Sequence, residues 1–333
     1  MDHRADEQNR FDLKINNLTL PYPMASTLNL IFTLSRVSNL PTVWTNCLAA
    51  WTINQSIEKI VGQTPEWHHP YSFDWGIFGW LLLGASFIYA GGCILNDAFD
   101  QEFDREYNPE RPIPAGEISA STVWIVGGIF LLFGGSVLLE LASCSLLVVF
   151  CLIGSVILYD WLHKKWVGSV WIMGSCRTLL WCVAASAGGL EISNPIWVCS
   201  LCVGAYVVGI SLFARNESKK TKNGFSSQLP VLFLFSPCLL TLALLILWNH
   251  LDPTRVFLLN CVGLYLGWIV IRAILIMRNS AVQGAIGKGV SILLPGICAV
   301  DAIAVCFFIP SLIAPCYLAQ FFAQILQKKF AAT

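Results

Sequence analysis

Long apolar runs dominate this sequence and restrict its possible folds more than any other feature. A helix that crosses a bilayer needs about 20 predominantly apolar residues, and about nine stretches of the chain come close to that length. They cover residues 37–57, 74–97, 120–140, 142–160, 167–189, 195–214, 228–249, 255–277 and 287–308. A tenth apolar stretch, 310–327, is expected to cross again or to lie along the interface. The sequence therefore predicts an all-α polytopic membrane protein, a bundle of about nine transmembrane helices.

Composition supports this prediction and excludes other classes of protein. Hydrophobic residues make up 56% of the 333-residue chain and charged residues only 12%, about half the share that is usual in soluble domains. The formal net charge is zero, so no overall field attracts an anionic partner, and we expect no nucleic acid. We predict one domain over 1–333, which begins with a polar cytosolic tail over 1–35 whose last part, from residue 24, is an amphipathic lead-in helix.

The distribution of Lys and Arg predicts how the bundle is oriented in the membrane. Alternate loops carry these residues, and the loops between them hold little more than Lys59 and Arg255. Basic loops of multi-pass proteins face the cytosol. We therefore expect a cytosolic N-terminus and the following residues in cytosolic loops: Arg105, Arg111, Lys164, Lys165, Arg215, Lys219, Lys220, Lys222, Arg278 and Lys288.

An acidic cluster closes the second apolar run. At about 100° per residue, Asp97, Asp100 and Asp104 fall within about 60° of one another on a helix, and Asn96 lies one turn before Asp100. Like charges this close need a cation or water to neutralise them, and Mg²⁺ prefers such hard oxygen ligands. The competing interpretation is a solvated helix end, since runs of charge are commonly solvated.

The motif that contains these residues resembles the first signature of the UbiA family of intramembrane prenyltransferases. Residues 96–104 read N-D-x-x-D-x-x-x-D, and residues 111–116 read R-P-x-x-x-G. The resemblance implies transfer of an isoprenyl group from an isoprenyl diphosphate to an acceptor, with Mg²⁺ as cofactor. By position, it implies metal ligation by Asn96, Asp97, Asp100 and Asp104, with the three aspartates catalytic, and Arg111 in substrate binding.

A second cluster follows the fourth apolar run. Tyr159 and Lys164 look like the family's short loop in which a lysine reaches the diphosphate, with Lys164 preferred over Lys165. We assign Lys164 to the catalytic residues and Tyr159 to substrate binding. The alternative for the lysines is a membrane-interface anchor. His163 is expected to be a surface histidine.

The sixth apolar run ends where the family normally has a second D-x-x-x-D motif, and here the sequence departs from that pattern. It offers one carboxylate, Glu217, with cations at Arg215 and Lys219. Guanidinium and ammonium groups pair well with phosphate oxygens, so Arg215, Asn216 and Lys219 are predicted to bind substrate and Glu217 to bind metal. The alternatives are a subgroup without transferase activity, or one with another donor or acceptor.

Three charged residues lie inside apolar runs, namely Arg177, Arg272 and Asp301. Ionisable groups at such positions face a cavity or a partner, so either arginine could pair with Asp301 or line a substrate pocket. Asn46, in the polar first run, is predicted to contact substrate on the acceptor side, as the resemblance loosely implies.

These observations favour an integral-membrane, Mg²⁺-dependent prenyltransferase whose acceptor is an aromatic compound or a lipid. Its expected partners are an isoprenyl diphosphate, that acceptor and the bilayer. The competing functions are a secondary transporter, whose intramembrane charges would bind an ion or solute, and a non-catalytic relative that binds isoprenoid lipids.

Overall fold

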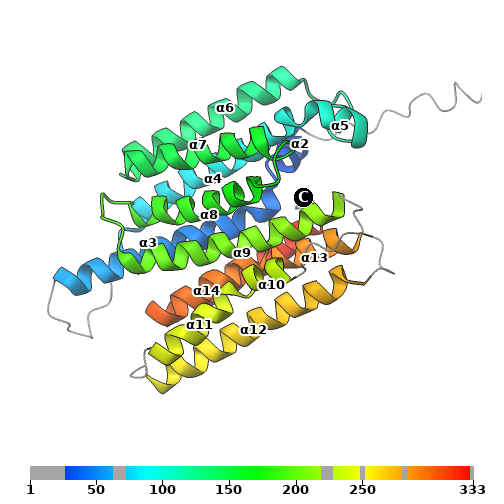
Figure 1. Cartoon of the computed structure of the whole chain (residues 1–333). Helices are drawn as coiled ribbons and strands as arrows, with labels where there is room; N and C mark the ends of the chain where they lie inside the picture. The colour runs from blue at the N-terminus through cyan, green and yellow to red at the C-terminus, as the bar shows by residue number, and fades with distance from the viewer. Residues whose placement is uncertain (1–26, 63–72, 219–227, 248–251, 280–283, 331–333) are drawn as a thin grey trace, which may run out of the picture.

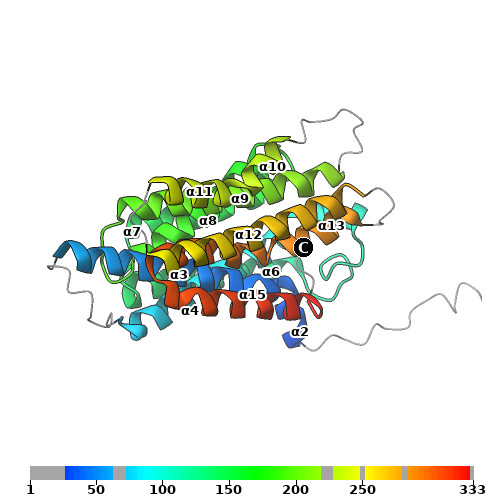
Figure 2. The ribbon, with the colours of Figure 1, turned by 90° about the horizontal axis from the view of Figure 1, so that it is seen from below.

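The computed structural model describes residues 27–62, 73–218, 228–247, 252–279 and 284–330. All regular secondary structure in these ranges is helical. The helices lie side by side and run roughly along one long axis, as Figures 1 and 2 show. The all-α prediction is confirmed. Residues 1–26 of the predicted tail lie outside the described ranges, and the single domain over 1–333 stays a prediction.

The helices follow the apolar runs closely. Their bounds are α2 Thr27–Leu34, η1 Val37–Asn39, α3 Leu40–Gly62, α4 Trp75–Phe99, α5 Gln101–Tyr107, α6 Ala120–Ser136, η2 Val137–Leu141, α7 Leu146–Leu162, α8 Ser169–Ala185, α9 Asn194–Ser218, α10 Gln228–Leu234, α11 Ser236–Leu247, α12 Pro253–Met277, α13 Ala285–Leu293, α14 Gly296–Phe308, η3 Pro310–Leu312 and α15 Ile313–Gln327. Helix starts carry recognisable caps. Asp74 accepts hydrogen bonds from the first backbone N–H groups of α4, and Asp252 does the same for α12.

The first predicted span, α3, lies inside the bundle and contacts α4, α8, α9, α14 and α15. Its polar side chains are buried and hydrogen-bonded. Thr52 donates to the carbonyl of Leu48, and Asn54 donates to the carbonyls of Ala185 and Glu191. Polar residues are tolerated at membrane depth when they face protein and have partners, which explains how so polar a helix can occupy this place.

The predicted span 228–249 is broken into α10 and α11, which meet at 53°. Pro237 is the cause, because proline has no N–H to donate to the carbonyl of Phe233 and its ring crowds that carbonyl. The hydroxyl of Ser236 donates to the same carbonyl at 2.8 Å and replaces the missing bond.

The predicted number of spans is not confirmed. Within the described residues, five helical stretches are long and apolar enough to cross a membrane, or six if α10 and α11 form one bent span. The stretches are 75–99, 120–141, 194–215, 253–277 and 285–308. α7 and α8 are apolar but have 17 residues each. The count of nine is therefore not confirmed, although each predicted run contains a described helix.

Candidate functional site

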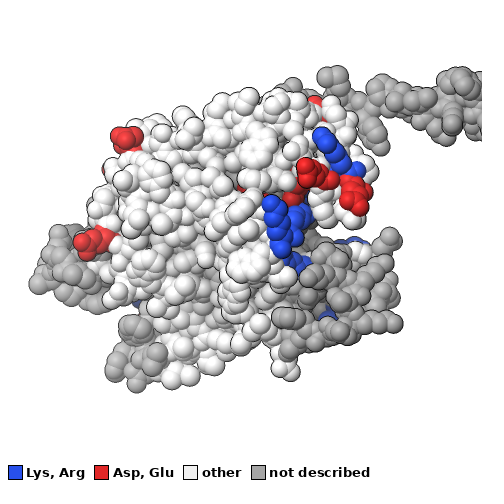
Figure 3. All heavy atoms as spheres, turned by 45° about the horizontal axis from the view of Figure 1, so that its top comes forward, with Lys and Arg blue, Asp and Glu red and all other residues white. Residues whose placement is uncertain are grey.

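The acidic motif lies at the junction of α4 and α5, at one end of the bundle (Figure 1). Helical hydrogen bonds continue through this junction, since the N–H of Asp100 bonds to the carbonyl of Asn96 and that of Asp104 to the carbonyl of Asp100. Figure 3 shows Lys, Arg, Asp and Glu side chains gathered at this end, while most of the remaining visible face is uncharged. The predicted periodicity therefore holds across the whole motif.

Asp97 and Asp104 converge on Arg111. The Nη1 of Arg111 lies 3.1 Å from Asp97 Oδ1 and 3.2 Å from Asp104 Oδ2. Arg36 approaches Asp97 Oδ1 from the start of the chain at 3.3 Å. Asp104 also accepts from Asn108 at 2.7 Å and is only 1% exposed, so its carboxylate is compensated within the protein.

Asp100 faces a different set of partners. Its carboxylate lies 3.1 Å from His163 Nε2 and 3.5 Å from Lys164 Nζ, both just after α7. The 60° offset from Asp97 on the helix accounts for this separation. His163 is half-buried and contacts the cluster, so the expectation of a surface histidine was wrong.

The partners of Asp100 keep it ionised. Burial raises the pKa of this carboxyl, but the hydrogen bond with the His163 ring and the electrostatic interactions with that ring, Lys164 and Arg111 outweigh burial, so the pKa of Asp100 lies below its ordinary value. Lys164 Nζ also lies 4.1 Å above the ring of Phe103, which places this cation over the start of α5. Tyr159 stacks on the ring of His163, with centroids 5.2 Å apart.

Asn96 joins the motif to α7. Its Oδ1 accepts from Arg36 Nη2 at 2.8 Å, and its Nδ2 donates to Asp160 Oδ1 at 3.0 Å. Asp160 is 5% exposed and is not among the site residues predicted from the sequence. A carboxylate in the last turn of an apolar helix, beside the expected Tyr159, is the signal that could have identified it.

The end of the sixth apolar run, where the family normally has its second motif, is described only in part. Arg215 donates to the carbonyls of Trp166 and His163 and to the hydroxyl of Ser169, so it braces the loop that carries Lys164. The side chains of Asn216 and Glu217, and all of Lys219, lie outside the described residues. Their assignments to substrate and metal stay predictions.

Asn46 is placed away from the acidic motif, on α3. It is fully buried, its Nδ2 lies 2.8 Å from both oxygens of Asp301, and its Oδ1 accepts from Arg177 at 3.0 Å. Arg177 and Asp301, which the sequence offered as possible partners, are therefore linked through the side-chain amide of Asn46. The third, Arg272, is exposed on α12 and lies over Trp268.

The side chains of the acidic motif are suitable ligands for Mg²⁺, but too few of them lie close together to hold the ion by themselves. Asn96, Asp97, Asp100 and Asp104 offer only hard oxygens, which Mg²⁺ prefers. In the described part of the chain, however, no three His, Cys, Asp or Glu side chains come close enough to hold one ion by themselves. The residues fit a Mg²⁺ that keeps waters and is shared with phosphate oxygens, which is how this ion is commonly bound.

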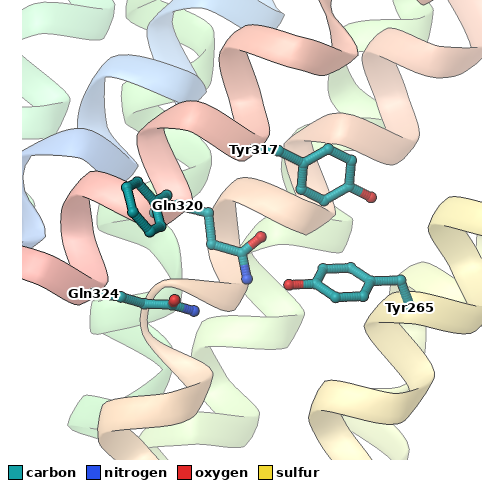
Figure 4. A pocket seen from close by; sticks show the side chains of 5 residues that line it. Tyr265, Tyr317, Gln320 and Gln324 are labelled. Atoms are coloured by element: carbon teal, nitrogen blue, oxygen red, sulfur yellow. The ribbon is translucent and has the colours of Figure 1, made fainter.

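A separate cavity of about 430 Å³ lies between α12 and α15. Gln320 and Tyr265 point toward one another across it, beside Tyr317 and Gln324 (Figure 4). All the residues that line it are uncharged, so it is chemically distinct from the cluster on α4, α5 and α7.

Solved structures share this fold. The chain superimposes on a digeranylgeranylglyceryl phosphate synthase with a TM-score of 0.58 and 18% identity, covering 86% of this chain and 100% of the other. It superimposes on a UbiA homologue from Archaeoglobus fulgidus bound to GPP and Mg²⁺ with a TM-score of 0.54 and 16% identity, covering 88% and 99%.

Curated relatives match over shorter stretches. Digeranylgeranylglyceryl phosphate synthase from Methanococcus aeolicus is 27% identical over 137 residues, which are 39% of this chain and 48% of the relative. Protoheme IX farnesyltransferase from Bdellovibrio bacteriovorus is 29% identical over 126 residues, 37% of this chain and 42% of the relative. The chain thus spans less than half the length of these two relatives.

The fold and the cluster define an integral, multi-pass α-helical membrane protein with a charged site at one end of its bundle. The model of the UbiA prenyltransferase family matches residues 67–288, which is more than half of the chain and includes the whole acidic motif. The chain belongs to this family.

Proposed function

We propose that this protein transfers an isoprenyl group from an isoprenyl diphosphate to an aromatic or lipid acceptor, with Mg²⁺. The observation that carries the proposal is the cluster itself, where three aspartates of one helical stretch meet Arg36, Arg111 and Lys164 at the end of an apolar bundle. Carboxylates beside cations suit a diphosphate bound together with a divalent ion. Family membership and the Mg²⁺ and GPP bound to the Archaeoglobus homologue support it.

Each group has a proposed task in breaking the bond between the isoprenyl carbon and oxygen. Asn96, Asp97, Asp100 and Asp104 would hold Mg²⁺, which when bound neutralises charge on the diphosphate and makes it a better leaving group. Arg36, Arg111 and Lys164 would donate hydrogen bonds to phosphate oxygens as negative charge develops there. Tyr159, Arg215, Asn216 and Lys219 are proposed as further substrate contacts, Asn46 as an acceptor-side contact and Glu217 as a further metal ligand.

The proposal includes the orientation of the helical bundle in the membrane. The diphosphate is made water-soluble by its charge, and the isoprenyl chain is apolar, so a site at the end of a membrane bundle suits both. We propose that this end faces the cytosol, because the basic loops gather there.

The test is Mg²⁺-dependent release of pyrophosphate from farnesyl or geranylgeranyl diphosphate by the detergent-purified protein. We expect Asp100→Asn and Asp104→Asn to slow release about a hundredfold or more, since metal-ion stabilisation contributes several kcal/mol to the transition state. Glu102→Gln is the matched control, because Glu102 is an exposed acid on the same short helix. Unchanged turnover in both aspartate variants would refute the assignment. Uptake of the diphosphate into proteoliposomes without release would favour a transporter.

A further inference from the structure

Asp160 contacts the acidic motif from a different helix. It lies in the last turn of α7, and its Oδ1 accepts the hydrogen bond from Asn96 Nδ2 at 3.0 Å. Both residues are buried, with Asp160 5% and Asn96 6% exposed. The contact joins residues 64 positions apart, so it fixes the relative position of α4 and α7 at the site.

The contact also fixes which way the Asn96 amide faces. An asparagine side chain has one atom that can ligate a cation, its oxygen, and one that can only donate. Here the nitrogen is directed to Asp160, so the oxygen is directed to the side of Arg36 and Asp97. A rotation of the amide by half a turn would lose the bond to Asp160 and place N–H groups against the guanidinium of Arg36.

A second observation points beyond ordinary packing. The other oxygen of Asp160, Oδ2, is buried and has no hydrogen-bond partner among the described residues. A buried acceptor without a partner destabilises the folded protein, because the hydrogen bond that it would make to water is not replaced. Leucine would fill the space without a buried polar atom, so the position carries a carboxyl group in spite of this cost.

We infer that Asp160 is a positioning residue that holds Asn96 Oδ1 toward the cation of the proposed site. The inference rests on the proposed function, because it assigns Asp160 a task only if Asn96 ligates Mg²⁺. Groups that orient a metal ligand through a hydrogen bond typically change metal affinity by about 10–100-fold when they are removed.

The test measures binding of Mn²⁺, a paramagnetic substitute for Mg²⁺, in the presence of inorganic pyrophosphate. The free Mn²⁺ signal in electron paramagnetic resonance gives the affinity without any turnover. We expect Asp160→Leu, which cannot accept a hydrogen bond, to weaken binding about 10–100-fold. Asp160→Asn can accept the same bond through its amide oxygen and should bind close to wild type. Melting midpoints in detergent show whether each variant is folded. If Asp160→Leu does not fold, Asp160→Ser replaces it, because the serine side chain is too short to reach Asn96.

A double-mutant cycle separates positioning from a merely structural effect. If Asp160 acts through Asn96, the variant Asn96→Leu/Asp160→Leu should bind Mn²⁺ as Asn96→Leu alone does. Wild-type affinity in a folded Asp160→Leu variant would overturn the inference. So would an Asp160→Asn variant as weak as Asp160→Leu, because charge and not hydrogen bonding would then be needed. A wild-type protein that binds no Mn²⁺ with pyrophosphate, or Asp100→Asn and Asp104→Asn variants that bind it normally, would refute the proposed function itself.

Discussion

Single side chains show how this membrane protein tolerates charge in its interior. Asn46 lies between Arg177 and Asp301 and bonds to both, so that one neutral amide connects α3, α8 and α14. Arg177 also donates to Thr42 at 3.2 Å and lies over the ring of Tyr89. These contacts give Asn46 and Thr42 a structural role inside the bundle. A contact between Asn46 and a substrate stays a prediction.

Removal of one member of this network should destabilise the protein. We expect Asn46→Ala and Asp301→Ala to lower the melting midpoint in detergent. Asn46→Ala removes the amide that donates to the buried Asp301 carboxyl and accepts from Arg177, and Asp301→Ala leaves the buried Asn46 amide nitrogen without its acceptor. The loss of a partner by a buried polar group costs about 1–3 kcal/mol. Asn260→Ala is the control, since Asn260 is exposed and bonds only to the carbonyl of Val256 on its own helix. Equal midpoints for Asn46→Ala and Asn260→Ala would contradict the structural role.

Helices pack most closely where glycines face one another. α4 and α6 cross at Gly84 and Gly134, where a Cβ on Gly134 would lie 2.8 Å from the carbonyl oxygen of Gly84 and 2.9 Å from the backbone nitrogen of Ile88. Small residues allow such close approach of backbones in membranes. The helix that carries the acidic motif is thus held against α6 by backbone contact.

A methyl group at this crossing should separate the two helices. We expect Gly134→Ala to lower the melting midpoint by an amount that corresponds to about 1–3 kcal/mol, because the obstacle is backbone and cannot rotate away. Gly128→Ala is the matched control on the same helix, since a Cβ there meets nothing within 4 Å. That variant should be neutral or slightly stabilised. A loss of similar size in both variants would show that close packing at the crossing is not the cause.

The whole molecule is asymmetric in charge. The described Arg and Lys residues of the basic loops lie toward the end that holds the acidic motif, and the opposite end carries acidic side chains on the face shown in Figure 3. This agrees with the alternation of basic loops along the sequence, on which the proposed orientation of the bundle rests.

Topology reporters test that orientation. We expect a reporter fused after Glu117, in the loop next to the acidic motif, to be read as cytosolic. A reporter fused after Glu191, between α8 and α9, should be read on the other side of the membrane. The same reporter fused to a truncated chain that ends before α3 serves as a cytosolic reference. A cytosolic reading after Glu191 would contradict the predicted topology.

The sequence by itself determined the helices and the face on which the acidic motif lies. Apolar runs and a 3.6-residue period are local properties, so Asn96, Asp97, Asp100 and Asp104 could be placed on one side of a helix without knowledge of its neighbours. The same local information predicted nine spans, and that count is not confirmed, because helices such as α7 and α8 are apolar but have only 17 residues each.

Only the tertiary structure decided which groups meet. His163 and Lys164 reach Asp100, Arg36 reaches Asp97, and Asp160 holds Asn96, each across about 60 residues of chain. Such pairs depend on how α4 and α7 pack and on where the loops return, and no periodicity encodes them. The residues that share one face of a helix can be predicted from its sequence alone. Which segment packs against that face depends on tertiary contacts between distant parts of the chain.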